Sequence, residues 1–255
     1  MSEPKIDILE DGALPRRVMT LFMLIDTSGS MIADGNIGKV NRAVEETIQQ
    51  LKDISDSNFD AEIRIAIMDF STDVKWVTPG SVALEDVVWN DLTAGGLTSM
   101  GAAFNELESK LSRSQFLKNS TGAYAPVLIL LSDGEATDSI DSGLSMLRNN
   151  NWYRVATKVA IAVDNAALDV LTQFTGTSET VIRYDSNKQD LQKLLTRLAV
   201  VSSKMQSRSK NANALGDAAD SGVVTDTDAA IQTAVDAVTQ VQQETGGNVD
   251  WESGW

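Results

Sequence analysis

Residues 18–30 read VMTLFMLIDTSGS, a run of apolar side chains that ends at Asp26 and continues into a short loop of small polar residues. An apolar run of this kind is typical of a strand covered on both faces. Ser28 and Ser30 are two residues apart, so an extended or turning loop can direct both hydroxyl groups the same way. The sequence therefore predicts a buried strand followed by oxygen-bearing side chains. The alternative for this stretch alone is a plain turn in which Asp26 caps the next helix.

Strand and helix patterns alternate from this run to residue 203. Buried strands are predicted at 63–70, 127–131, 157–163 and 180–184, and helices at 37–54, 100–117, 140–149, 166–174 and 188–203. Segment 73–78 follows its preceding strand too closely for a crossover helix, so it is predicted to be an antiparallel edge strand. The pattern indicates an α/β fold with a doubly wound, mainly parallel six-stranded sheet and one antiparallel edge strand.

The composition excludes several classes of chemistry. The 255 residues include no His and no Cys, which rules out Ser-His-Asp and Cys-His catalysis, disulfides and iron–sulfur clusters. Any metal site must use oxygen ligands, which favour Mg²⁺, Mn²⁺ or Ca²⁺ over Zn²⁺ or Cu. The net charge of −15 argues against a nucleic acid or an anionic membrane as partner.

The chain divides by charge. After Lys210 it has no Lys or Arg, and its eight acidic residues give this end a charge of −8. We therefore expect an N-terminal extension at 1–16, a globular domain at 17–205 and an acidic low-complexity tail at 206–255. A short helix is expected at 228–244, with an apolar stripe formed by Ile231, Val235, Val238 and Val241. The tail either docks this stripe on a folded surface or is a disordered solubilising appendage. The polar N-terminus and the lack of a long apolar segment indicate a cytoplasmic protein.

Two further loops follow predicted strands in the same way. Residues 93–101 read TAGGLTSMG, and residues 132–138 read SDGEATD directly after a buried strand. Each is compatible with an ordinary turn. In a parallel sheet, however, the carboxyl ends of the strands meet at one edge, where ligands bind. Together the loops bring a mixed shell of carboxylate and hydroxyl oxygens, which suits a partly hydrated Mg²⁺ with an open coordination position. The residues that would form this shell are Asp26, Ser28, Ser30, Thr98 and Asp133.

The three loops, DTSGSM, GGLTSMG and LLSDGEATD, closely resemble the metal-ion-dependent adhesion site of von Willebrand factor type A (VWA) domains. The resemblance covers about residues 17–203. It implies that Ser28, Ser30 and Thr98 are direct ligands of the metal, and that Asp26 and Asp133 act directly or through water. It also implies a non-catalytic, Mg²⁺-dependent protein-interaction module, with Mn²⁺ or Ca²⁺ as other cations, whose partner protein supplies an acidic residue to the metal.

The stretch GGLTSMGAAF is most similar to bacterial tellurium-resistance proteins of the TerY type. This resemblance implies an adaptor in a bacterial stress-response or tellurite-resistance complex, or in a signalling complex with a protein kinase or phosphatase. Within the same family, a second implied role is that of an adaptor subunit in an ATP-driven chelatase or remodelling machine.

An enzyme is the alternative from a different class. Asp26 could serve a metal-dependent phosphohydrolase, but a haloacid-dehalogenase-type phosphatase needs a second Asp where this chain has Ser28. No P-loop string occurs. Five other acidic residues near strand ends either form a negative rim around the site or serve as turn residues and helix caps: Asp69, Asp73, Asp138, Asp141 and Asp164.

Overall fold

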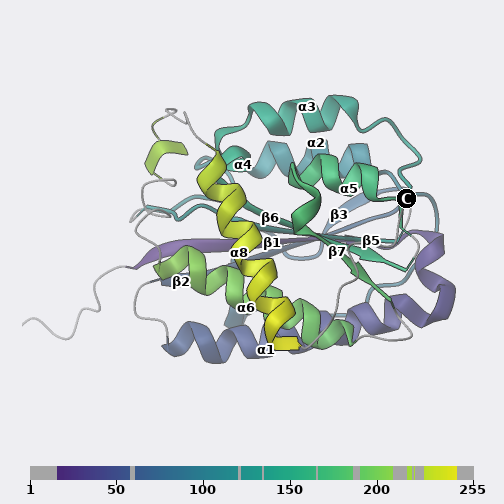
Figure 1. The fold of residues 1–255 in the computed structure, drawn as a ribbon, viewed down its shortest axis with the longest axis horizontal. Helices are drawn as coiled ribbons and strands as arrows, with labels where there is room; N and C mark the ends of the chain where they lie inside the picture. The colour runs from purple at the N-terminus through teal and green to yellow at the C-terminus, as the bar shows by residue number, and fades with distance from the viewer. Residues whose placement is uncertain are drawn as a thin grey trace, which may run out of the picture.

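A twisted central sheet with helices on both faces forms the body of the molecule (Figure 1). The computed structural model describes residues 16–57, 61–119, 122–133, 135–164, 166–185, 190–208, 217–219, 221 and 227–245. Within these residues the sheet has seven strands, in the order β3-β2-β1-β5-β6-β7, and β4 pairs with β2 outside this path. The predicted fold class, a doubly wound and mainly parallel α/β sheet with an antiparallel edge, is confirmed.

Five strands run parallel, namely β1 (Arg17–Asp26), β2 (Ala61–Phe70), β5 (Val127–Ser132), β6 (Thr157–Val163) and β7 (Val181–Tyr184). The antiparallel edge consists of β3 (Val74–Trp76) and β4 (Val82–Ala83), both paired with β2. Six strands were predicted from the sequence, and β4 was not among them, because a strand of two residues leaves no readable pattern.

The helices form two layers. One face of the sheet carries α1 (Asn36–Ser57) and α6 (Leu191–Arg208), and the other carries α2 (Met100–Lys110), α3 (Asp141–Asn149), α4 (Asn151–Val155) and α5 (Leu168–Thr175). Short 3-10 turns are η1 (Gly29–Gly35), η2 (Leu84–Asp86) and η3 (Ser178–Thr180). In the described part of the chain, no helix combines the length and the apolar character that crossing a membrane requires.

The helix predicted at 100–117 was too long, since α2 ends at Lys110. The apolar residues that extended the pattern belong to the turns that follow, where Phe116 packs edge-on against Trp76 with ring centroids 4.6 Å apart. Helix α4 was not predicted. Its first turn is capped by the Asn150 side chain, which accepts from the backbone N–H groups of Trp152 and Tyr153.

Strand β1 joins the two cores. Leu21 and Ile25 contribute to the core beneath α1 and α6, whereas Phe22 and Leu24 contribute to the core beneath α2 and α3. Alternate side chains of a strand point to opposite faces, so an apolar run is needed when both faces are covered. The apolar run that ends at Asp26 is therefore the strand that both helix layers share.

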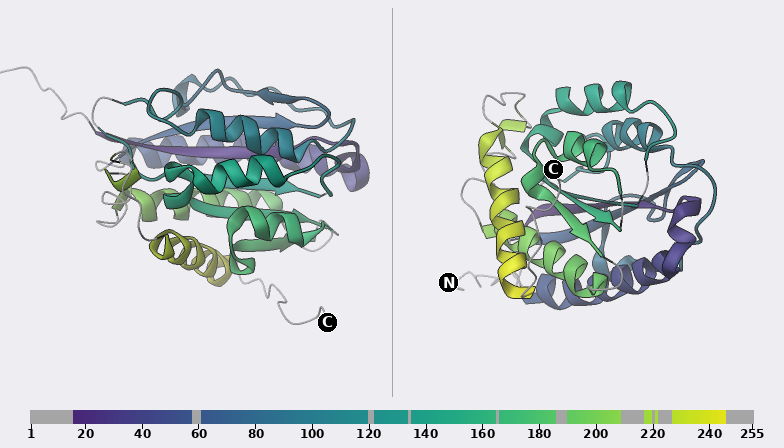
Figure 2. Two further views of the ribbon diagram at one scale, coloured as in Figure 1. Left: turned by 90° about the horizontal axis from the view of Figure 1, so that it is seen from above. Right: turned by 45° about the vertical axis from the view of Figure 1, so that its right-hand side comes forward.

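A further helix, α8 (Asp228–Thr245), packs against α6 and β6 and crosses the side of the sheet, from the layer that holds α4 to the layer that holds α6 (Figure 2). Its buried face is formed by Ala230, Ala234, Ala237, Val238 and Val241, whereas Ile231 and Val235 are only partly buried. The face is rotated from the expected stripe toward the alanines, because small side chains let the helix approach its neighbours closely. The aromatic residues near the end of the tail, Trp251 and Trp255, lie outside the described residues.

The packing of α8 generates a stability prediction. Ala237 is fully buried, so Ala237→Leu inserts volume into a filled core and should lower the free energy of unfolding by about 1–3 kcal/mol. Thr239→Leu, on the exposed face of the same helix, should stay within about 0.5 kcal/mol of wild type. Urea denaturation followed by circular dichroism measures both. Equal stability of the two variants would contradict the packing of α8.

Lys158 is a buried charge at the amino end of β6. Its ammonium donates to the carbonyl oxygens of Tyr153 (3.0 Å) and Ala156 (3.1 Å) and lies 4.9 Å from the centroid of the Tyr153 ring. Burial lowers the pKa of Lys158 from its ordinary 10.5 to about 8. The folded state therefore loses this proton before the unfolded state does, and the charged form costs stability below pH 8.

This difference sets a pH dependence with a definite sign. Between pH 8 and 10.5 the unfolded state binds more protons at Lys158 than the folded state, so stability rises with pH in this window. Relative to Lys158→Met, the wild type should gain on the order of 1–3 kcal/mol from pH 7.5 to 10.5. Chemical denaturation of both proteins across this range measures the difference, and subtracting the variant removes the titration of tyrosines. A constant difference would show that Lys158 keeps its ordinary pKa.

Candidate metal centre

Asp26 and Asp133 lie at the same edge of the sheet because β1 and β5 are parallel neighbours, with Ile25 opposite Leu131. Asp26 is fully buried. Its Oδ1 accepts from the backbone N–H of Ser28 at 2.8 Å, and its Oδ2 accepts from the Ser132 hydroxyl at 2.5 Å. Two donors from two strand ends thus fix the orientation of this carboxylate.

The two serines of the first loop connect this carboxylate to the second strand end. The hydroxyl oxygens of Ser28 and Ser30 are 3.0 Å apart, and Ser30 donates to Oδ1 of Asp133 at 2.7 Å. Adjacent oxygens around an octahedral Mg²⁺ with bonds of about 2.1 Å are separated by about 3 Å. The spacing of these oxygens therefore fits neighbouring positions around one Mg²⁺.

Thr98 reaches the same edge through backbone hydrogen bonds between the loops. Gly29 donates to the carbonyl of Gly96 at 3.1 Å, and Gly95 donates to the carbonyl of Thr27 at 2.8 Å. Gly96 has φ +84°, and a Cβ there would lie 2.4 Å from the Thr72 hydroxyl oxygen. Glycine at this position therefore lets the second loop pass close to Thr72 in the turn between β2 and β3.

The third loop holds Thr98 from the other side. Thr137 donates its backbone N–H to the carbonyl of Thr98 at 2.9 Å, and the Thr137 hydroxyl accepts from the Thr98 N–H at 3.0 Å. The Asp138 carboxylate accepts from Gly101 and Ala102, each at 2.9 Å, and so caps the start of α2. Asp138 was predicted to belong to a negative rim or to serve as a turn residue or helix cap, and the structure shows the helix cap.

The structure thus joins four of the predicted residues, Asp26, Ser28, Ser30 and Asp133, in one hydrogen-bonded network, and it places the backbone of Thr98 beside them. Ser132, which orients Asp26, was not among the predicted site residues. Its position directly before the Asp of SDGEATD was the available signal, since the end of a buried strand lies at the ligand-binding edge.

The site concentrates negative charge in a desolvated position. Burial raises the pKa of Asp26, and it raises that of Asp133, which the nearby Asp26 and Asp164 raise further. Asp164 follows the end of β6 and accepts from the Asn36 amide at 2.8 Å. Carboxylates in this arrangement are stabilised by a bound cation.

The donor set defines which cation fits. In the described ranges, no group of three or more His, Cys, Asp or Glu side chains is arranged to hold a metal ion. A cation here would depend on the serine and threonine hydroxyls in addition to two carboxylates. An all-oxygen set with few charges fits a hard cation that keeps part of its water shell.

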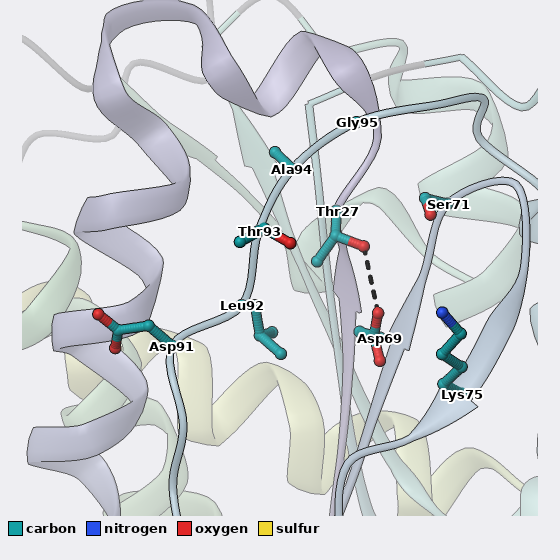
Figure 3. Close-up of a pocket in the computed structure, with 9 residues that line it drawn as sticks. All are labelled: Thr27, Asp69, Ser71, Lys75, Asp91, Leu92, Thr93, Ala94 and Gly95. Carbon is teal, nitrogen blue, oxygen red and sulfur yellow. Dashed lines mark hydrogen bonds between the residues drawn. The ribbon is translucent and has the colours of Figure 1, made fainter.

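A polar pocket of about 360 Å³ borders the site (Figure 3). Thr27, which lies between Asp26 and Ser28, forms one wall and donates to Oδ2 of Asp69 at 3.4 Å. Burial raises the pKa of Asp69, and the charge of Lys75 on the adjacent strand opposes this rise. The pocket gives the edge of the sheet a recess beside the candidate metal centre.

Solved structures with this architecture come from diverse organisms. One is proximal thread matrix protein 1 from the mussel byssus, in a form with a zinc-occupied MIDAS (metal-ion-dependent adhesion site) motif. Its sequence is 17% identical, the match covers 71% of this chain and 46% of that chain, and the TM-score is 0.54. Another is a von Willebrand factor type A protein from Catenulispora acidiphila, which is 14% identical. The match covers 72% of this chain and 42% of that chain, with a TM-score of 0.53. The match spans less than half the length of either protein, and at this identity it shows the shared fold.

No curated protein matches the chain. The family model of the von Willebrand factor type A domain matches residues 21–197, which includes all three loops of the candidate metal centre and the strands that position them. The chain therefore belongs to the von Willebrand factor type A domain family.

Proposed function

We propose that this protein is a Mg²⁺-dependent protein-binding module whose cation is held by Asp26, Ser28, Ser30, Thr98 and Asp133. The observation that carries the proposal is the network of hydroxyl and carboxylate oxygens between β1 and β5, in which neighbouring oxygens are 2.7 and 3.0 Å apart. VWA domains are commonly metal-dependent protein-interaction modules, and this chain belongs to that family.

A divalent cation is supported from two directions. The mussel proximal thread matrix protein, which shares the fold, has zinc in its MIDAS motif. In the present chain, the lack of His and Cys favours Mg²⁺, with Mn²⁺ and Ca²⁺ as other hard cations. Repulsion between Asp133 and the nearby carboxylates of Asp26 and Asp164 supplies a physical reason for the site to take up a positive charge.

Each residue of the centre has a separate task in this proposal. The bound cation supplies an open coordination position for a carboxylate of the partner protein. Ser132 and the backbone of Ser28 hold Asp26 in one orientation, and Ser30 holds Asp133. The backbone hydrogen bonds around Thr98 keep the second loop in register with the first.

Binding explains the residues of the site better than catalysis does. A phosphohydrolase that uses Asp26 as nucleophile would need a second acid two residues later, where Ser28 instead bonds to Ser30. The stretch GGLTSMGAAF resembles bacterial tellurium-resistance proteins of the TerY type, which supports a cytoplasmic adaptor role in a bacterial stress-response or kinase–phosphatase complex. The related role in an ATP-driven chelatase or remodelling machine would use the same metal centre.

Metal binding should raise the melting temperature. At Mg²⁺ or Mn²⁺ concentrations of about 100 times Kd, binding adds about 2.7 kcal/mol, which corresponds to a rise of roughly 5–10 °C for a domain of this size. Asp26→Asn should abolish the rise, because it removes a charged ligand while keeping the side-chain shape. Asp73→Asn, which alters an exposed acid outside the three loops, should retain the rise. Thermal melts in cation and in chelator make the comparison, and an undiminished rise in Asp26→Asn would refute the assignment.

Partner binding should require both the cation and the acid of the partner. A protein captured from the native host in Mg²⁺ should be lost in EDTA and by Asp26→Asn, and retained by Asp73→Asn. Replacing the contacting Asp or Glu of the captured protein with its amide should also abolish binding. Circular dichroism in EDTA should stay unchanged, because the cores do not include the metal centre. A partner that binds equally well in EDTA would assign the centre a purely structural role.

A further inference from the structure

Two exposed hydrophobic side chains lie in or directly beside the loops of the candidate metal centre. Among the described residues, four large hydrophobic side chains are exposed: Ile32 (62%), Val88 (77%), Leu97 (57%) and Met146 (46%). Ile32 is two residues from Ser30, and Leu97 directly precedes Thr98. The other two lie outside the three loops, so they provide internal controls.

The local structure directs Ile32 outward. Its neighbour Met31 is fully buried in the core beneath α1 and anchors η1. The backbone N–H of Met31 donates to the carbonyl of Ser28 at 3.1 Å, so the turn that contains Ile32 is tied to the serines of the centre. Ile32 therefore lies in the turn that directly follows the two serines, with its side chain exposed.

Leu97 is held outward in a similar way on the second loop. Thr98 beside it is only 5% exposed, and the backbone N–H of Leu97 donates to the Thr72 hydroxyl at 3.1 Å. Gly96, on its other side, accepts from Gly29 of the first loop. The two apolar side chains thus come from loops that are hydrogen-bonded to each other.

Folding does not account for apolar residues at these two positions. Both side chains remain mostly in water, and the contacts that hold their loops are made by backbone atoms and by neighbouring residues. Isolated exposed hydrophobic residues are common on protein surfaces. A pair in the loops of one polar centre is instead suited to contact with a partner, because apolar surface gains free energy when it is buried in an interface.

We propose that Ile32 and Leu97 form an apolar rim that selects a partner segment in which the metal-binding acid is flanked by apolar side chains. The inference rests on the proposed function, because the acid must first reach the cation. A carboxylate alone selects poorly, since acidic side chains are present on nearly every protein surface. The apolar rim supplies the additional discrimination, and it excludes water around the coordinated carboxylate.

The test is a selection from a random peptide library displayed on phage, using the full chain in Mg²⁺ and eluting with EDTA. The eluted peptides should be enriched in Asp or Glu with an aliphatic or aromatic residue within two positions. Individual selected peptides should bind Ile32→Ser and Leu97→Ser about tenfold more weakly than wild type, equivalent to about 1.4 kcal/mol. Val88→Ser and Met146→Ser should bind them as wild type does, since these residues lie outside the rim.

The outcomes separate the two proposals. Acidic peptides that elute with EDTA but lack apolar neighbours, or that bind the rim variants as tightly as wild type, would overturn the inference and leave the proposed function intact. An EDTA eluate without enriched peptides, together with melts that do not respond to Mg²⁺, would overturn the proposed function and with it the rim. Melts of the rim variants should respond to Mg²⁺ as wild type does, which shows that the loops and the centre are preserved.

Discussion

The parallel pairing of β1 with β5 is the constraint on which the rest of the site depends. It brings two strand ends, one carrying Asp26 and the other followed by Asp133, to one edge of the sheet. Both strands are buried on both faces, so their register is specified by two cores at once. The positions of the carboxylates are therefore set by hydrophobic packing, and the loops adjust the hydroxyl groups around them.

The sequence was most informative for elements whose burial is determined by a local pattern of apolar residues. The apolar run before Asp26 predicted a strand covered on both faces, and the structure has β1 between two helix layers. Features set by contacts across the fold were missed or misjudged. The end of α2 at Lys110 depends on turns that pack Phe116 against Trp76, and the two-residue β4 exists only through its pairing with β2. Neither requirement appears in the local periodicity.

The three loops of the candidate site could be located from the sequence, because each loop carries its own short motif at a strand end. The sequence did not determine the roles of acids such as Asp138 and Asp164, because an aspartate can equally well belong to a negative rim, a turn or a helix cap. The structure separates them by their partners: Asp138 accepts from the first N–H groups of α2, whereas Asp164 accepts from Asn36 and adds to the charge near Asp133. Distinguishing these roles requires knowing which donors lie nearby, and that depends on the tertiary structure.

The hydrogen bonds from Gly29 to Gly96 and from Gly95 to Thr27 join the first two loops entirely through the main chain. Such a connection does not depend on the identity of the exposed side chains next to it. Mutation at Ile32 or Leu97 can therefore accumulate during evolution without disturbing the oxygens of the centre. If the centre acts as proposed, gene duplication followed by change at these few positions would give paralogues that retain one ion chemistry and diverge in the proteins that they recognise.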